Sequence, residues 1–310
     1  MKIIKCGGNS LKNYADRKKL YNEIKEYNGS IVLIVSAFHD SPYSTSSLKE
    51  LLKDNYTYEM EQELITLGEV ISSIRVTNEL LNEFIDATLI YKDQIGIYVE
   101  TTNKMDHIIE IDNHYIQEAV LNHKVVVIPG FIGINQNQRT VSLNRNGSDL
   151  TAMIVAKMLD MNDVFLYKDV LGLASFDPHN EKNYKLYKNV SYDLMLQIML
   201  HGSDLIQEEA IRFAKDNQIN VHVQHYLNHS YGTNVISTNK ERVVVFQLND
   251  NDVYIDGYNN KDTIENILIL KDIPFDYILP CNSYIKIVSG YHNESQIIKL
   301  LHQMYMKGDL

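Results

Sequence analysis

Two glycine-rich turns, each next to a basic residue, carry the residue types best suited to chemistry in this sequence. In the first turn Lys5 stands just before Gly7 and Gly8, and in the second Arg145 and Asp149 flank the start of a predicted helix. Backbone N–H groups at a helix start bind anions, and an arginine beside them adds a cation. Glycine also serves simply to close tight turns. The pattern therefore leaves two interpretations: a site for phosphate and an anionic substrate, or two structural turns.

The elements that must position these turns alternate between strand-like and helical patterns through most of the first 235 residues. Continuous apolar runs predict strands that are buried on both faces. Such alternation is typical of a largely parallel sheet with helices on both sides, in which ligands bind beyond the carboxyl ends of the strands. We predict strands over 2–5, 31–35, 125–128, 164–167 and 221–223, and helices over 11–27, 56–81, 112–122, 149–160, 191–200 and 206–217.

The composition changes near Tyr231, and residues 239–242 are typical of a linker. The remainder predicts a small α+β domain with its own amphipathic helices. The division we expect is therefore a catalytic domain over 1–236 and a second domain over 242–310. Within the second domain we predict strands over 242–248, 252–257, 275–280 and 284–289, and helices over 261–271 and 293–306.

Charge and cysteine content exclude several classes of function. The net charge of −11 argues against nucleic acid or an anionic membrane as a partner, since these need clustered lysine and arginine. The only cysteines, Cys6 and Cys281, form no metal-binding or disulfide pattern, which fits a reducing compartment. No apolar run approaches the roughly 18 residues of a membrane span, and no signal peptide is apparent. We expect a cytoplasmic protein without a protein-bound metal cluster.

Six motifs, in order and at consistent spacing from residue 2 to about 236, resemble those of the aspartate kinases of the amino acid kinase superfamily. The family patterns are K-[FY]-G-G-T-S, V-S-A, G-E-x-x-S-[AS], P-G-F-x-G, R-G-G-S-D and T-D-V-x-G followed by D-P. The matching segments here are Lys5–Ser10 (KCGGNS), Val35–Ala37 (VSA), Leu67–Ser73 (LGEVISS), Pro129–Gly133 (PGFIG), Arg145–Asp149 (RNGSD) and Lys168–Gly172 (KDVLG) with Asp177 and Pro178.

The resemblance implies a three-layer αβα sandwich of the amino acid kinase type, followed by a single small ACT-like domain. It also implies an enzyme of amino-acid biosynthesis that moves the γ-phosphoryl group of ATP, with Mg²⁺, onto the side-chain carboxylate of L-aspartate, giving an acyl phosphate. A homodimer formed through the ACT-like domain would be its usual assembly. Family members usually carry two ACT-like units, so the regulatory region of this chain resembles a shortened form of theirs.

The same resemblance implies roles for individual residues. Lys5 would contact the transferring phosphoryl group, and Asp149 would orient that lysine or help to organise metal and phosphate. Arg145 would bind a substrate carboxylate in the bidentate manner open to a guanidinium group, and Glu69 would bind the substrate ammonium group. The remaining residues implied are Ser36, Thr45 and Ser148 on the substrate side, and Gly7, Gly8, Lys168, Asp169 and Asp177 on the nucleotide side.

The sequence departs from the family mainly on the nucleotide side. Asp204 stands where the family has a lysine that contacts the nucleotide, His179 follows Asp177-Pro178 where arginine is usual, and Lys168 replaces threonine. Lys168 would then supply a replacement cation. Three functions remain open: the aspartate kinase, a kinase for another small acidic substrate, and a non-catalytic amino-acid-binding regulatory subunit. For Asp204 itself, a role as N-cap of a helix starting near Leu205 is the alternative to a place beside the polyphosphate.

Overall fold

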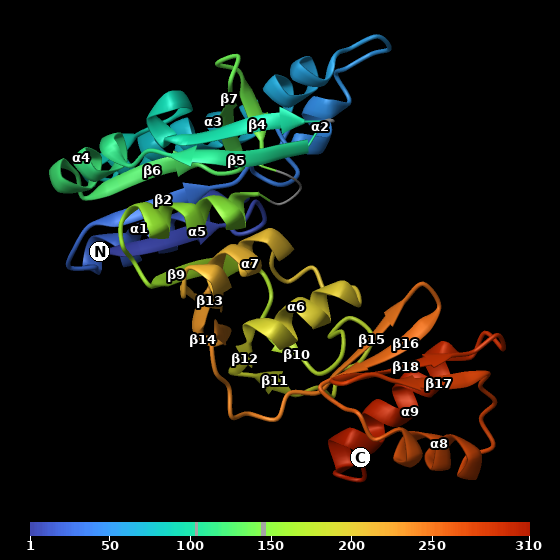
Figure 1. The fold of residues 1–310 in the computed structure, drawn as a ribbon. Helices are drawn as coiled ribbons and strands as arrows, with labels where there is room; N and C mark the ends of the chain where they lie inside the picture. Colours follow the sequence, from blue (N-terminus) through green and yellow to red (C-terminus); the bar gives the residue numbers. More distant parts are fainter. Residues whose placement is uncertain (103–104, 144–146) are drawn as a thin grey trace. The chain divides into compact units, whose positions relative to one another are not determined.

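The computed structural model describes residues 1–102, 105–143 and 147–310. Its central element is an eight-stranded sheet (Figure 1). From β13 through β9, β1, β2 and β6 to β3, neighbouring strands pair in parallel, and Lys5 lies opposite Ile34 on one side and Leu166 on the other. The strands lie in the order β12 (Asn189–Ser191), β14 (Asn228–Ile236), β13 (Asn220–His225), β9 (Asp163–Lys168), β1 (Lys2–Cys6), β2 (Ile31–Val35), β6 (Val125–Pro129) and β3 (Ala87–Leu89).

Helices cover both faces of this sheet, as the continuous apolar runs predict. Helices α1 (Tyr14–Glu26) and α3 (Tyr58–Asn82) share a core with one face, where Ile4, Leu33 and Val127 are fully buried. Helix α5 (Ser148–Met158) contacts β1, β9 and β2. The remaining helices of this region are α2 (Thr45–Lys49), η1 (Lys92–Ile95), α4 (His114–Asn122) and α7 (Glu208–Asp216).

A second, smaller sheet lies against the amino-terminal half of α3 and against η1. Its hairpin of polar strands was not predicted from the sequence, because these strands lack a continuous apolar run. The order is β5 (Met105–Ile111), β4 (Ile97–Thr102), β7 (Ile132–Asn135) and β8 (Thr140–Ser142). None of the described helices is both long and apolar enough to cross a membrane.

The chain divides into two compact units, residues 1–170 with 209–231 and residues 171–208 with 232–310. In the second unit an antiparallel sheet packs with two helices around an apolar core that includes Phe176. Residues 171–208 belong to this unit through buried polar contacts such as Ser175 Oγ with His302 Nε2 at 2.9 Å. Besides β12, the elements of this unit are β10 (Leu173–Ala174), β11 (Leu186–Tyr187), α6 (Tyr192–Leu200), β15 (Val245–Asn249), β16 (Asp252–Asp256), α8 (Lys261–Leu270), β17 (Tyr277–Pro280), β18 (Tyr284–Val288) and α9 (Glu294–Lys307).

One expectation about a helix start is wrong. Helix α7 begins at Glu208 rather than near Leu205, and Asp204 is an exposed residue four positions earlier. An N-cap residue directly precedes the first helical residue, so Asp204 does not cap this helix.

Candidate active site

The side chain of Lys5 reaches the α5 side of the sheet because of strand alternation. Successive side chains of a strand point to opposite faces, and Ile4 and Cys6 belong to the core on the α1 and α3 side. Lys5 therefore points the other way. Its neighbour in register on β9 is Leu166, so Lys168, two residues further on, lies on the same face as Lys5.

Asp149 bridges these two lysines at the carboxyl ends of β1 and β9. Its Oδ1 lies 2.7 Å from Lys5 Nζ, and its Oδ2 lies 2.9 Å from Lys168 Nζ. The Asp149 side chain is 1% exposed, Lys5 9% and Lys168 16%. Burial alone would raise the pKa of Asp149, but the charges of Lys168 and Lys5 outweigh it and hold this pKa well below its usual range. The carboxylate is thus ionised, and the cluster carries one net positive charge.

The start of α5 places this carboxylate. Asp149 lies in the first turn of the helix, where a negative charge is favoured by the helix dipole. The preceding Gly147 is required by close packing, since a Cβ there would lie 2.1 Å from the carbonyl oxygen of Leu143. Likewise a Cβ on Gly130 would lie 2.7 Å from the side chain of Ser148, one of the predicted substrate-side residues. The glycines of these motifs are therefore explained at least partly by packing.

The loops after β1 and β2 lie against each other. The His39 N–H donates to the Gly8 carbonyl at 3.2 Å, and a Cβ on Gly8 would lie 2.4 Å from the Ala37 carbonyl oxygen. At Gly7 the surroundings differ, because a Cβ there would meet nothing closer than the Tyr167 carbonyl at 3.7 Å and Lys5 Nζ at 4.0 Å. A Cβ at Gly7 would therefore fit in ordinary van der Waals contact, so close packing does not require glycine at this position.

Glu69 on α3 is buried beneath the loop after β2. Its Oε1 accepts the Ala37 N–H at 3.3 Å, whereas Oε2 has no hydrogen-bond partner among the described residues. Burial raises the pKa of Glu69 to about 7, although the Ala37 N–H and the charge of Lys5 both favour the ionised form. A buried carboxylate oxygen without a partner is costly, and a cationic ligand would satisfy it.

The other predicted site residues make no contact described above with the cluster of Lys5, Asp149 and Lys168. Ser36 follows β2 and donates its N–H to the Cys6 carbonyl at 3.3 Å, while Thr45 opens the short helix α2. Asp169 is exposed and accepts from Asn9 Nδ2 at 2.7 Å. Asp177 belongs to the second compact unit, where it accepts the His179 N–H in a turn. Arg145 lies outside the described residues, and its role stays a prediction.

Sequence reasoning missed the residues that hold the site loops in place. Ser72 Oγ accepts the Phe38 N–H at 3.1 Å, one helical turn after Glu69. Arg17 is fully buried, pairs with Glu79 through two 2.7 Å contacts, and donates to the Leu11 carbonyl at 2.7 Å. The motif match at Leu67–Ser73 was a signal for Ser72. Nothing local in the sequence distinguishes Arg17 from the other charged residues of α1.

Comparisons with known proteins show the family to which this chain belongs. The profile of the family described as "Amino acid kinase family" matches residues 1–225. Aspartokinase 1 of Bacillus subtilis (strain 168) is 29% identical over 253 residues, which cover 78% of this chain and 63% of that protein. The match thus spans less than two thirds of that relative's length.

Solved structures show the same fold. Aspartokinase III of E. coli, solved in complex with aspartate and ADP, superposes with a TM-score of 0.67 at 16% identity, covering 94% of this chain and 79% of that chain. UMP kinase from Ureaplasma parvum superposes with a TM-score of 0.53 at 17% identity, covering 76% of this chain and 97% of that chain. The fold is thus a mostly parallel α/β sandwich followed by a small ACT-like domain.

Proposed function

Because the chain belongs to the amino acid kinase family, we propose that it transfers the γ-phosphoryl group of ATP to the side-chain carboxylate of L-aspartate. The observation that carries the proposal is the buried cluster of Lys5, Asp149 and Lys168 at the carboxyl edge of the sheet. Two ammonium groups fixed around one carboxylate provide the positive charge that phosphoryl transfer requires. The similarity to Aspartokinase 1 supports aspartate as the acceptor.

The reaction depends on positioning more than on proton transfer. The acceptor carboxylate is already ionised at neutral pH, so no strong general base is needed. One of its oxygens would bond to the γ-phosphorus while the bond from phosphorus to the β–γ bridging oxygen breaks and ADP leaves. Lys5 would contact the transferring group, and Asp149 would fix the positions of Lys5 and Lys168. Gly7 would leave room beside Lys5 for the phosphoryl oxygens.

Mg²⁺ would enter together with ATP. This ion usually binds substrate phosphates and water with only one or two protein carboxylates, and the described residues contain no group of three or more potential ligands that would hold a metal alone. Asp169 is the exposed carboxylate near this edge that would help to hold it, whereas both oxygens of Asp149 pair with lysines. Its charge would offset that of the phosphates.

Glu69 would bind the α-ammonium group of the substrate through Oε2. We predict that Glu69→Gln weakens aspartate binding by at least about ten-fold, because a buried charge-assisted contact is lost. Because the pKa of Glu69 is raised to about 7, wild-type binding should also weaken as the pH falls below 7, whereas binding to the variant should not change in this range. Calorimetry with aspartate from pH 6 to 8 measures both effects.

Stability provides an independent check on the same variant. The pKa of Glu69 is about 7 in the folded chain and 4.5 in the unfolded chain, so the buried charge lowers the free energy of unfolding. This loss of stability grows as the pH rises from 4.5 to 7 and is complete above pH 7. Glu69→Gln should therefore raise Tm at pH 8 and leave it unchanged near pH 4.5. Unaltered aspartate binding together with this gain in stability would place the ammonium site elsewhere.

The reaction itself is tested by an acyl phosphate trap. With ATP, Mg²⁺, aspartate and hydroxylamine, the wild-type chain should form aspartyl hydroxamate. Glutamate in place of aspartate tests the alternative of another small acidic substrate. If neither aspartate nor glutamate gives a hydroxamate, the enzyme proposal is contradicted.

Asp204 and His179 favour the second candidate, a regulatory subunit that binds an amino acid but does not catalyse. A carboxylate close to a polyphosphate is repulsive, so this candidate predicts weak or absent ATP binding alongside normal aspartate binding. Calorimetry with ATP and Mg²⁺, with and without aspartate, separates the two candidates.

The charge of Asp204 can be tested directly. If this exposed side chain faces the polyphosphate, Asp204→Lys changes the local charge by two units and should tighten ATP binding by roughly ten-fold at low salt. The gain should shrink as ionic strength rises. Glu209→Lys, at another exposed carboxylate nearby in sequence, is the charge-matched control. Equal effects of both substitutions would mean that only the overall charge matters.

We also propose that the ACT-like domain pairs with that of a second copy. Strand β17 is an edge strand of its sheet, and Tyr277 and Leu279 on it are 51% and 45% exposed. An exposed edge strand with apolar side chains is a natural place for association.

A further inference from the structure

Phe131, in the turn between β6 and β7, has an unusual backbone conformation. Its φ is 69°, and the residue is buried. A bulky residue rarely adopts this left-handed region, and it stays there only where the surrounding contacts hold it. Such conformations gather at functional sites, so the contacts that hold Phe131 are informative.

Both backbone polar groups of Phe131 are bonded to other segments of the same unit. Its N–H donates to Thr151 Oγ1 on α5 at 3.0 Å, and its carbonyl accepts the N–H of Leu143, just after β8, at 2.8 Å. The turn after β6 is therefore joined to α5 on one side and to the end of β8 on the other.

Thr151 is a fully buried polar residue of α5. Its hydroxyl donates to the Gly147 carbonyl at 3.0 Å, one helical turn back, while the same oxygen accepts the Phe131 N–H. Gly147 is the N-cap of α5 and has no side chain that could cap the first turn. The Thr151 hydroxyl thus fixes the first turn of α5, which contains Asp149, against the turn after β6.

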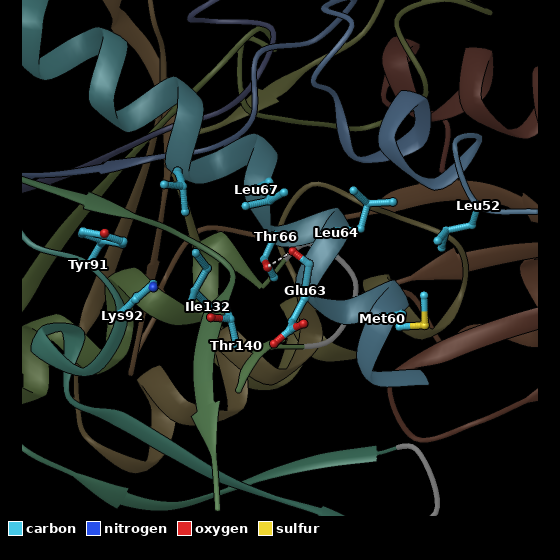
Figure 2. A pocket seen from close by; sticks show the side chains of 11 residues that line it. Leu52, Met60, Glu63, Leu64, Thr66, Leu67, Tyr91, Lys92, Ile132 and Thr140 are labelled. Atoms are coloured by element: carbon cyan, nitrogen blue, oxygen red, sulfur yellow. Dashed lines mark hydrogen bonds between the residues drawn. The ribbon is translucent and has the colours of Figure 1, made fainter. Parts of the chain in front are cut away.

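Gln62 on α3 holds the end of β8. Its Oε1 accepts two hydrogen bonds from Ser142, one from the backbone N–H at 3.0 Å and one from Oγ at 2.5 Å. Both residues are buried. Close to this contact in sequence, Thr66 of α3 lines a groove together with Ile132 of β7 and Thr140 of β8 (Figure 2). Helix α3 therefore packs directly on the hairpin that ends at Ser142.

The end of β8 in turn touches the start of α5. The carbonyl oxygen of Leu143 lies so close to Gly147 that a Cβ there would come within 2.1 Å of it. Gln62 therefore acts on the start of α5 through Ser142 and Leu143. Because Gln62 lies seven residues before Glu69, both side chains are on the buried face of α3. One face of α3 thus carries the carboxylate for the substrate ammonium group and also supports the start of α5.

We propose that Thr151 and Gln62 are positioning residues for Asp149. They hold the first turn of α5 where the two oxygens of this carboxylate meet Lys5 at 2.7 Å and Lys168 at 2.9 Å. This role rests on the phosphoryl transfer proposed above, because that reaction uses the fixed ammonium groups. A displacement of about 1 Å at a reacting site can lower the rate by about 10²-fold.

The first test compares two buried threonines whose hydroxyls each bond to a carbonyl one helical turn back. Thr151→Val removes such a bond together with the contact to Phe131. Thr77→Val on α3, the matched control, removes the 2.8 Å bond to the Ser73 carbonyl. Both substitutions keep a β-branched side chain of similar size. In Thr151→Val the buried Phe131 N–H loses its partner, so the turn and the start of α5 are expected to move.

Thr151→Val should lower kcat for hydroxamate formation by about 10- to 100-fold. KM for ATP and aspartate should change little, because the contact with the transferring group matters most in the transition state. Thr151→Ser keeps the hydroxyl and should restore most of kcat, and Thr77→Val should retain the wild-type value. Equal kcat for Thr151→Val and Thr77→Val would overturn the proposal.

The thermal transition shows whether Thr151→Val folds, and Gln62 provides a second comparison if it does not. Gln62→Met has a similar size but lacks the oxygen that accepts from Ser142, so kcat should fall by about ten-fold. Gln62→Glu keeps an acceptor oxygen and should lose less. Unchanged kcat in Gln62→Met would overturn the role of Gln62.

The second test does not depend on catalysis. In competitive acetylation with trace acetic anhydride, Lys5 and Lys168 should react slowly compared with exposed lysines of α1, because both are largely buried and paired with Asp149. Thr151→Val should increase the labelling of both lysines several-fold, whereas Thr77→Val should not.

The labelling separates the positioning role from the proposed function. Equal labelling in Thr151→Val and Thr77→Val would overturn the positioning role even if the wild type is active. Faster labelling in Thr151→Val, with no hydroxamate from the wild type, would contradict the kinase proposal and support the dependence of Asp149 on Thr151.

Discussion

Replacing Lys5 with alanine is expected to lower kcat for phosphoryl transfer by about 10³-fold or more. One positioned cation at a transferring phosphoryl group contributes on this scale. The fold should survive, because Asp149 keeps its 2.9 Å contact with Lys168 and does not become an unpaired buried charge. Hydroxamate formation measures the activity, and the thermal transition measures the fold.

The matched control is Lys19→Ala, which removes an exposed lysine of α1 that forms an ion pair with Asp16. It should retain wild-type activity. If Lys5→Ala reacts as fast as Lys19→Ala, Lys5 does not contact the reacting group. If Lys5→Ala fails to fold, Lys5→Met keeps the aliphatic part of the side chain and separates the loss of charge from the loss of packing.

Asp149→Asn is expected to affect stability more than any other single change discussed above. It leaves Lys5 and Lys168 close together and buried without their counter-charge, which costs about 3–5 kcal/mol, or on the order of 10 °C in Tm for a unit of this size. Activity should also fall strongly, since the lysines lose their fixed positions. Scanning calorimetry measures the loss of stability.

The pH dependence and a second substitution make this prediction specific. The pKa of Asp149 is lower in the folded chain than in the unfolded one, so its stabilisation is complete above the unfolded value of about 4 and is lost only below it. The difference in Tm between wild type and variant should be constant from pH 7 to 5 and shrink in more acidic solution. Adding Lys168→Met to Asp149→Asn should restore part of the stability without restoring activity. A variant as stable as wild type at pH 7 would mean that the two lysines are not held by this carboxylate.

The middle strands of the central sheet could be predicted from the sequence because they are buried on both faces. Runs such as Ile31–Val35 and Val125–Pro129 are apolar throughout, and the structure confirms them as strands of a mostly parallel sheet. The hairpin of β4 and β5 could not be predicted in the same way. Its strands are partly exposed and contain Tyr98, Glu100 and Thr101, so their pairing depends on each other and on β7 rather than on a local pattern.

The candidate site likewise has one part that the sequence predicts and another that only the three-dimensional structure shows. The resemblance of the motifs predicts that Asp149 orients Lys5 or helps to organise metal and phosphate, and the structure places the two side chains 2.7 Å apart. The contact of Lys168 with the same carboxylate needs the register of β1 and β9, which no local pattern contains. The start of α7 was predicted too early, because residues 204–207 are compatible with a helix by composition but lie in the loop before it.

The shared core of the second compact unit has a consequence for how this chain can be divided. Cutting the gene after codon 236 would follow the pattern of the sequence, yet Phe176 packs in the apolar core of the carboxyl-terminal sheet. Tyr187 donates to the Val244 carbonyl, and the buried Asp256 accepts from His201 and Gln197. A fragment that ends at 236 would therefore expose aromatic and polar groups that now have partners. Residues 171–208 are inherited with the kinase sequence but depend physically on the carboxyl-terminal domain, so the two parts can evolve separately only if these contacts change together.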